Sequence, residues 1–275
     1  MTPEAVGHRA LAANLSDIAA MGARPLLATI ALGVPPGFEP AWILAAYRAM
    51  AALAARTGCA IVGGDVVRAP ALFLSISVVG EVAAPDVRLR TAGRPGDVVA
   101  VTGALGASRA GLELLRRPEL AAGLAPAEIA AAHDAFGFPE PRLREGDWLA
   151  SSAHVRAMMD LSDGLSTDLA RLATSSGCGA VVDDVPVAEA ARSVAAAAGA
   201  EAERYALDGG EDFELLVTIA PRAFGYLAAR FRTRFGRPLI AVGRLVREPG
   251  LRRTSDGAEH PLDPAGFSHL EAARD

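Results

Sequence analysis

Four groups of acidic residues stand in glycine- and serine-rich segments that are otherwise apolar. Carboxylate oxygens are the ligands that Mg²⁺ prefers, and one or two of them usually share the ion with phosphate oxygens and water. Glycines beside the acids would let backbone N–H groups approach a phosphate. The pattern therefore predicts a site for magnesium and a polyphosphate. The four groups are Asn14-Leu15-Ser16-Asp17, Gly63-Gly64-Asp65, Asp160-Leu161-Ser162-Asp163-Gly164 and Asp208-Gly209-Gly210-Glu211-Asp212.

The first three groups also have ordinary structural explanations, which the sequence leaves open. Asn14 and Asp17 share one face of an expected helix, and that face could simply be polar and exposed. Asp65 follows a short apolar run, so it could belong to a β-turn, although the end of a strand is also a common place for ligand groups. Ser162 or Asp163 could N-cap the helix that follows, a role that is compatible with phosphate binding.

The fourth group is the densest, because four acids fall between Asp208 and Glu214. Such crowding costs repulsion unless cations, water or hydrogen-bond donors offset it, and a solvated loop is the structural alternative. The glycine-containing segment 102–108 is a weaker phosphate-binding candidate, since it matches neither GxGxxG nor a Walker A motif. The sequence has no GxSxG elbow and no histidine paired with a serine or cysteine motif, so covalent catalysis has no candidate nucleophile.

The composition excludes several classes of protein. The 275 residues are 51% hydrophobic and can bury one sizeable core or two moderate ones. The 27 basic and 32 acidic residues give a net charge of −5 without a basic block, so we expect no nucleic-acid partner. Cys59 and Cys178 belong to no CxxC or Cys/His cluster, and we expect both to be small buried apolar residues.

The sequence does not indicate a membrane-spanning helix or an export signal. The alanine-rich runs are interrupted by polar residues before they reach the length of a spanning helix. Met1 to Glu4 show no basic region followed by an apolar one, so export is not indicated. We therefore expect a cytoplasmic protein with no membrane partner.

The hydrophobic periodicity predicts the elements that position the acids. Thr2 and Pro3 should start a helix that stops at Gly22. This order predicts an α/β (α+β) fold with two domains, residues 1–100 and residues 101–275. Further expected helices are 40–56, 162–174, 187–198 and 222–235, with others from 107 and around 129 and 148; expected strands are 26–34, 59–62, 72–79, 98–102, 180–185, 213–219 and 239–245.

The segment ALAANLSDIAAMGA at residues 10–23 resembles the signature helix of thiamine-monophosphate kinases. The order of later motifs is similar to that family along essentially the whole chain. These motifs are Gly63-Gly64-Asp65, Arg90 before a Gly-x-Pro-Gly-Asp turn, Val101-Thr102-Gly103, Pro141-Arg142, Asp160-Leu161-Ser162-Asp163-Gly164-Leu165 and Gly209-Gly210-Glu211-Asp212-Phe213-Glu214.

The resemblance implies ATP-dependent, Mg²⁺-assisted phosphorylation of thiamine monophosphate to thiamine diphosphate by direct in-line transfer. The phosphate of the substrate would attack without a phospho-enzyme, and Arg90 would offset the developing charge. The implied site residues are Asp17, Asp65, Asp160 and Asp163 for Mg²⁺; Gly64, Asp65, Arg90 and Ser162 for ATP; and Glu211 and Phe267 for thiamine monophosphate.

The resemblance also implies an assembly and a difference from the family. In the superfamily of aminoimidazole ribonucleotide synthetase and selenophosphate synthetase, the N-terminal mixed sheets of two protomers close a barrel across a homodimer. Family members carry a further segment ahead of the signature helix, with a Gly-Asp-Asp motif, a Ser/Thr-Asp metal motif and a substrate-contacting histidine, and we expect this chain to lack it. The alternatives are a catalytically impaired nucleotide-binding or dimerisation module, and another ATP-dependent enzyme of the superfamily.

Overall fold

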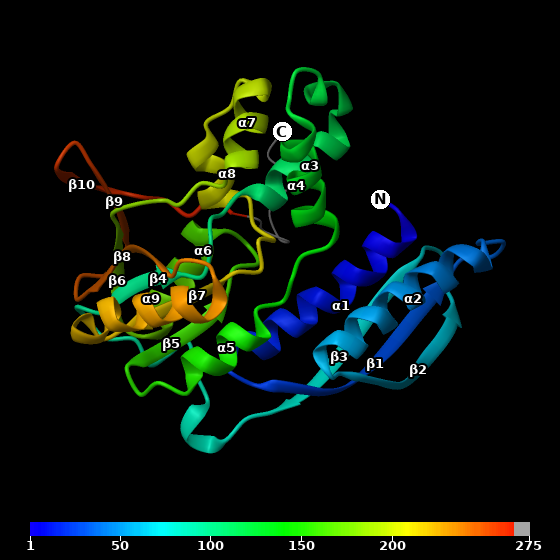
Figure 1. The fold of residues 1–275 in the computed structure, drawn as a ribbon, viewed down its shortest axis with the longest axis horizontal. Helices are drawn as coiled ribbons and strands as arrows, with labels where there is room; N and C mark the ends of the chain where they lie inside the picture. The colour runs from blue at the N-terminus through cyan, green and yellow to red at the C-terminus, as the bar shows by residue number, and fades with distance from the viewer. Residues whose placement is uncertain (267–275) are drawn as a thin grey trace.

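The computed structural model of the chain describes residues 1–266 and contains two β-sheets. A three-stranded sheet has the strand order β2-β1-β3, and a seven-stranded sheet has the order β10-β9-β6-β8-β4-β7-β5. Figure 1 shows the small sheet toward one end of the long axis and the large sheet toward the other, with helix α1 extending between them. This mixed arrangement of helices and sheets confirms the predicted α/β fold class.

Helix α1 (Pro3–Ala20) carries the first acidic group and starts as the sequence predicts. Thr2 is the N-cap, and its Oγ1 accepts a hydrogen bond from the backbone N–H of Ala5 at 3.2 Å. Helix α2 (Pro40–Thr57) packs closely against α1, since a Cβ on Gly7 would lie 2.0 Å from the carbonyl oxygen of Ala46. Gly7 therefore allows the backbones of the two helices to approach each other.

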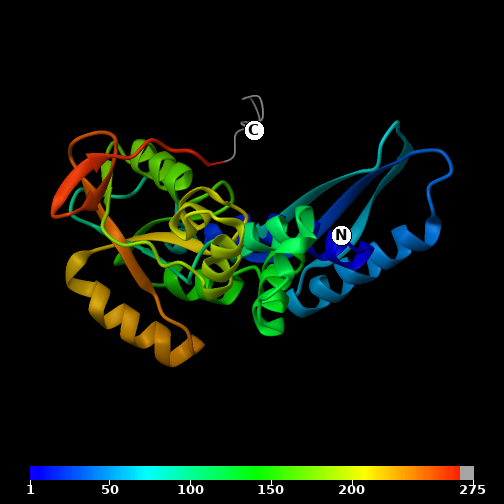
Figure 2. The same ribbon diagram turned by 90° about the horizontal axis from the view of Figure 1, so that it is seen from above.

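The small sheet contains β1 (Arg24–Val34), β2 (Ala60–Arg68) and β3 (Phe73–Glu81), and β1 pairs in parallel with β2 and antiparallel with β3. One face packs on the two helices, where Leu15 and Met50 are fully buried. Figure 2 shows α2 running along one side of these strands. The other face exposes apolar side chains in the single chain: Val62, Val67, Phe73 and Val79.

The sequence prediction for the second strand was wrong at its C-terminal end. The strand was expected to stop at residue 62 and to leave Asp65 at its end. Instead, β2 continues through Gly64, and Asp65 lies opposite Ala31 of β1 within the ladder. Ala28 pairs with Ile61 and Thr29 pairs with Gly63, so Val62 is an extra residue in β2. The register shifts at this point, as at a β-bulge.

The large sheet is antiparallel except between β6 and β9, and helices cover both of its faces. Helix α6 (Leu165–Ser175) packs on one face, and helices α5 (Leu143–Ala150) and α9 (Pro221–Phe235) pack on the other. The strands are β4 (Val98–Val101), β5 (Val155–Asp160), β6 (Gly179–Val182), β7 (Leu215–Ile219), β8 (Ile240–Val246), β9 (Leu251–Ser255) and β10 (Ala258–Pro261).

A separate group of helices packs beside the large sheet, around a core that includes Leu114, Val194 and Tyr205. Its members are α3 (Ala107–Arg116), α4 (Pro126–Gly137), α7 (Glu189–Ala198) and α8 (Ala202–Asp208), and short 3₁₀ helices span Ala84–Asp86 and Pro118–Ala121. Cys59 and Cys178 are both buried free cysteines, as predicted. Within the described part of the chain, none of the helices combines the length and the apolar character needed to cross a membrane.

Candidate functional site

Asp160 is the last residue of β5, at the point where this strand meets α1. Ser16 of α1 donates a hydrogen bond from Oγ to Asp160 Oδ2 at 2.8 Å, and Asp160 is 7% exposed. Burial raises the pKa of Asp160 to about 7, and the nearby charges of Asp17 and Asp168 also raise it, whereas the bond from Ser16 lowers it. The structure therefore brings two of the predicted metal ligands, Asp17 and Asp160, into electrostatic contact.

The loop between β5 and α6 is organised by Asp168, which the sequence analysis missed. Its Oδ2 accepts hydrogen bonds from the backbone N–H groups of Ser162 at 3.0 Å and Asp163 at 2.9 Å. Helix α6 begins after Gly164 without a side-chain N-cap, so the structural alternative that Ser162 or Asp163 caps it was wrong. An acid in the first turn of the helix was the available signal, since it can satisfy N–H groups of the preceding loop.

The carboxylates of Asp163 and Asp168 pair with the same arginine. Arg171, one turn further along α6, forms ion pairs with both carboxylates. Burial raises the pKa of Asp168 to about 6, and the charge of Asp163 adds to this shift, whereas the backbone donors and Arg171 oppose it. In this structure Arg171 offsets the negative charge at Asp163.

The loop that carries Glu211 lies directly against the loop that carries Ser162. The backbone N–H of Glu211 donates to the carbonyl oxygen of Ser162 at 2.8 Å, and that of Phe213 donates to Leu161 at 2.9 Å. Glu211 and Phe213 have φ values of 60° and 50°, a region that non-glycine residues rarely adopt. Strained backbone of this kind often occurs at functional sites.

Arg9 of α1 holds the side chain of Glu211. Its guanidinium forms an ion pair with the Glu211 carboxylate and lies over the ring of Phe136 at 4.1 Å from the centroid. Arg9 also donates to the backbone carbonyl oxygen of Phe136. The helix that positions Asp17 thus also positions Glu211.

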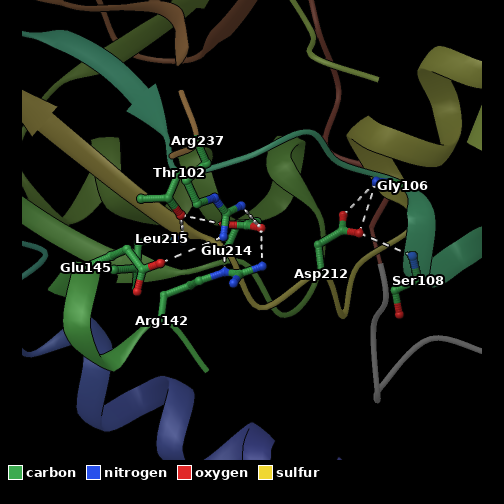
Figure 3. A network of polar contacts seen from close by, with 9 residues as sticks. All are labelled: Thr102, Gly106, Ser108, Arg142, Glu145, Asp212, Glu214, Leu215 and Arg237. Carbon is green, nitrogen blue, oxygen red and sulfur yellow. Dashed lines mark hydrogen bonds and ion pairs between the residues drawn. The ribbon is translucent and has the colours of Figure 1, made fainter. Parts of the chain in front are cut away.

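The other acids of the fourth group each have separate donors, so the solvated-loop alternative was wrong for them. Asp208 accepts from Ser166 Oγ at 2.6 Å. Asp212 accepts from the backbone N–H groups of Gly106, at 2.8 and 3.0 Å, and of Ser108, at 3.3 Å (Figure 3). Burial raises the pKa of Asp212 to about 7, against the lowering effect of these N–H groups. The segment 102–108, the weak phosphate-binding candidate, therefore already binds a carboxylate of the chain itself.

Glu214 is the centre of a buried ionic network (Figure 3). Its carboxylate accepts from Thr102 Oγ1 at 2.6 Å, from Arg142 Nη2 at 2.8 Å and from Arg237 Nη2 at 2.5 Å. Burial alone would raise the pKa of Glu214, but the two arginines and Thr102 outweigh it and lower the pKa. This network joins the Glu211 loop to β4 and α5.

The remaining predicted residues lie away from Asp160. Asp65 is exposed on β2, and its Oδ1 accepts only a local hydrogen bond, from Val66 N–H at 2.9 Å. Gly64 is required by packing, since a Cβ there would lie 1.8 Å from the carbonyl oxygen of Ile30. The side chain of Arg90 is exposed, and its carbonyl accepts from Ser176 at 2.8 Å. Phe267 lies outside the described residues.

The four predicted metal ligands do not form one cluster in the described chain. Among residues 1–266, no three His, Cys, Asp or Glu side chains are grouped as a metal site. Asp17 lies near Asp160, Asp163 is paired with Arg171, and Asp65 is on the other sheet. Their assignment as ligands stays a prediction.

Comparisons with known proteins find relatives that match nearly the whole chain. Residues 1–82 match the family described as AIR synthase related protein, N-terminal domain, and residues 94–221 match the corresponding C-terminal domain. The chain is 35% identical over 272 residues to thiamine-monophosphate kinase of Salmonella typhimurium, and the alignment covers 98% of this chain and 81% of the relative. The chain belongs to the thiamine-monophosphate kinase family.

Solved structures of the family have the same fold. Thiamine-monophosphate kinase from Stenotrophomonas maltophilia K279a is 33% identical with a TM-score of 0.84, covering 94% of this chain and 81% of that one. AaThiL complexed with AMPPCP and TMP is 29% identical with a TM-score of 0.84, covering 98% of this chain and 82% of that one. The resemblance seen in the sequence is thereby confirmed, together with the kinase class.

Proposed function

We propose that this chain transfers a phosphate from ATP to thiamine monophosphate, which yields thiamine diphosphate and ADP. The observation that carries the proposal is the meeting of α1, β5 and the 208–214 loop, which places Asp17, Asp160 and Glu211 on neighbouring segments. AaThiL, a relative with this fold, is complexed with AMPPCP, an ATP analogue, and TMP.

The charges around Asp160 fit a divalent cation. The pKa of Asp160 is raised by burial and also by the neighbouring charges of Asp17 and Asp168, so a cation would favour its ionised form. We propose Asp17, Asp65, Asp160 and Asp163 as the residues that would hold Mg²⁺. When bound, Mg²⁺ supplies charge neutralisation for the phosphates of ATP.

We infer in-line transfer without a covalent intermediate. The substrate phosphate is already largely ionised near neutral pH, so its oxygen can attack without a strong general base. In this proposal Gly64, Asp65, Arg90 and Ser162 contact ATP, and Arg90 offsets the charge that develops on the transferred group. Glu211 and Phe267 face thiamine monophosphate.

We also propose two domains and a homodimer in the cytoplasm. The two sheets would mark the domains, joined by the connection 82–97, and the ranges of the two family matches support this division. The uncovered face of the small sheet exposes Val67 by 44% and Val79 by 51%, and such apolar area is typical of an interface. A second copy of this sheet would bury it.

The test is an assay of the purified chain with MgATP and thiamine monophosphate. We expect thiamine diphosphate and ADP to form in equal amounts, with product formation abolished by EDTA. ATP binding without turnover would contradict kinase activity and favour a nucleotide-binding module. Faster turnover of a different acceptor would instead favour another enzyme of the superfamily.

Replacing Arg9 with methionine should weaken substrate binding more than turnover. Without the ion pair, Glu211 loses the group that positions it toward the proposed substrate. We expect the KM for thiamine monophosphate to rise about tenfold, with kcat reduced less than about threefold. Initial rates at saturating ATP measure both constants.

Two further variants separate positioning from folding. Glu211→Gln removes the same ion pair but leaves the contact between Arg9 and Phe136, and it should reproduce the rise in KM. Arg24→Met removes an exposed pair with Glu81 and should change neither constant. An unchanged KM in Arg9→Met would show that Arg9 does not position the substrate site.

A further inference from the structure

A second concave site lies at the opposite end of β5 from Asp160. It is a cavity of about 570 Å³ between the connection that follows the small sheet, the start of β5 and the start of α9. The strand spans Val155–Asp160, so the two sites are separated by about 15 Å along it. The cavity is of the size that small-molecule ligands occupy.

The lining of this cavity is strongly basic although the whole chain has a net charge of −5. Four arginines contribute to it from three different segments of the chain, and the lining includes one acid. The charged and titratable residues that line it are Asp86, Arg88, Arg94, His154, Arg156 and Arg222.

Asp97 positions two of the arginines. Asp97 is 1% exposed and is the last residue of the turn 93–97. It has no part in the proposed phosphate transfer. Its Oδ2 accepts from the backbone N–H of Arg94 at 2.9 Å, and its Oδ1 pairs with Arg156 Nη1 at 3.3 Å. Asp97 therefore holds the backbone of Arg94 and the side chain of Arg156, two residues that line the cavity.

Two other arginines leave positive charge that the described chain does not neutralise. Arg88 is 8% exposed, and its terminal nitrogens donate to backbone carbonyls that include those of Ala150 and Ser152. Its Nε is buried and has no hydrogen-bond partner among residues 1–266. Arg222 is in the first turn of α9, where the positive end of the helix dipole disfavours a cation. This turn contains no acid that would offset the charge.

We propose that this cavity binds a small molecule that carries a phosphate or diphosphate group. Arginines bind such oxyanions with charge-assisted hydrogen bonds, and the N-terminus of α9 adds a favourable dipole. An anion there would offset the charge of Arg222 and lie close to the buried guanidinium of Arg88, which also lines the cavity. Arg90, a proposed ATP contact, lies on the same connection but is not among the residues that line the cavity, so the inference does not depend on the kinase activity.

Calorimetric titration with inorganic pyrophosphate tests the site. EDTA is present so that no metal bridges the ligand to carboxylates. We expect the dissociation constant to rise at least about tenfold in the double variant Arg94→Gln with Arg222→Gln, because both side chains are exposed and their loss leaves the core intact. Arg232→Gln removes an exposed charge further along α9, outside the cavity, and should leave binding unchanged.

The alternative results each overturn the proposal. Equal affinity in the double variant would exclude the cavity, and an equal loss in Arg232→Gln would indicate an effect of net charge alone. An Arg90→Gln variant that loses binding while the double variant keeps it would place pyrophosphate in the proposed ATP site. No heat of binding for the unmodified chain at millimolar pyrophosphate would also overturn it.

Discussion

Replacing Asp160 with asparagine is expected to reduce Mg²⁺- and ATP-dependent turnover of thiamine monophosphate by about 100-fold or more. The side chain would keep its size and could still accept the hydrogen bond from Ser16. It would lose the negative charge that the proposed cation requires. Product formation at saturating MgATP measures the loss, and raising Mg²⁺ to high concentration should restore little of it.

The same substitution is expected to stabilise the chain in EDTA at pH 8. In the folded chain the pKa of Asp160 is about 7, against an ordinary value of 3.8, so above pH 7 the folded chain must keep a buried charge that no cationic side chain among residues 1–266 pairs with. Asparagine removes that cost, and we expect the free energy of unfolding to rise by about 2 kcal/mol. Gain of stability with loss of activity is the result that a merely structural residue would not give.

The pH dependence of stability provides an independent check. Burial raises the pKa values of Asp160, Asp168 and Asp212 to about 7, 6 and 7. A raised pKa means that the folded chain binds protons more tightly than the unfolded chain, so stability falls as the pH rises from 5 to 8. Thermal unfolding in EDTA should show this fall, and Asp160→Asn should make it shallower.

An exposed aspartate supplies the control for both measurements. Asp147→Asn on α5 removes the same charge from an exposed position and should change neither turnover nor the pH dependence. If Asp160→Asn retains near-normal turnover, Asp160 does not hold the cation. If it instead lowers stability at pH 8, the carboxylate is stabilised in the folded chain and its raised pKa is wrong.

Local sequence signals predicted the elements that carry the first acidic group. The helix α1 starts at the expected proline because Thr2 satisfies a free N–H group, and it ends before Gly22, which has a φ of +70°. The strand β1 and the helix α2 also match their predicted ranges closely, because each has a long periodic or apolar pattern with proline at its boundary.

The sequence analysis missed β5, α8, β9 and β10. The strand β5 was missed because Arg156 interrupts its apolar pattern, although the residue is explained by its pair with Asp97. The strands β9 and β10 are rich in charged residues, and their pairs with neighbouring charges replace apolar burial. The turn Asp256-Gly257 between them was a usable hairpin signal.

The sequence motifs identified acids that make specific contacts in the structure, but they did not predict the residues that these acids contact. The contact between Ser16 and Asp160 joins residues 144 positions apart, which no pattern of spacing in one sequence reveals. Arg9 was missed for the same reason, since only the fold brings it near the Glu211 loop. Asp168 instead acts on the loop directly before its own helix, and its place in the first turn of α6 was a local signal that the sequence analysis did not use. The Glu214 network likewise depends on partners from distant segments.

Replacing Glu214 with glutamine is expected to cause the largest loss of stability. Its carboxylate is buried and is shared by Arg142 and Arg237, whose side chains are 21% and 23% exposed. Glutamine would leave Arg142 without a counter-charge and Arg237 with only the 3.9 Å contact to Glu145, and breaking a buried pair in this way costs about 3 to 5 kcal/mol. We expect the midpoint of thermal unfolding at pH 8 to fall by about 10 °C.

The pH dependence and an exposed pair show whether burial is the cause. The pKa of Glu214 is lowered in the folded chain, so its stabilising effect is present above pH 4.5 and is lost as the pH falls through the lower folded pKa. The difference between Glu214→Gln and the unmodified chain should therefore shrink in acid. Glu81→Gln, whose partner Arg24 is exposed, should cost less than about 1 kcal/mol. Equal losses in the two variants would mean that the buried network contributes no more than a surface ion pair, and the 208–214 loop would then be held by its backbone hydrogen bonds alone.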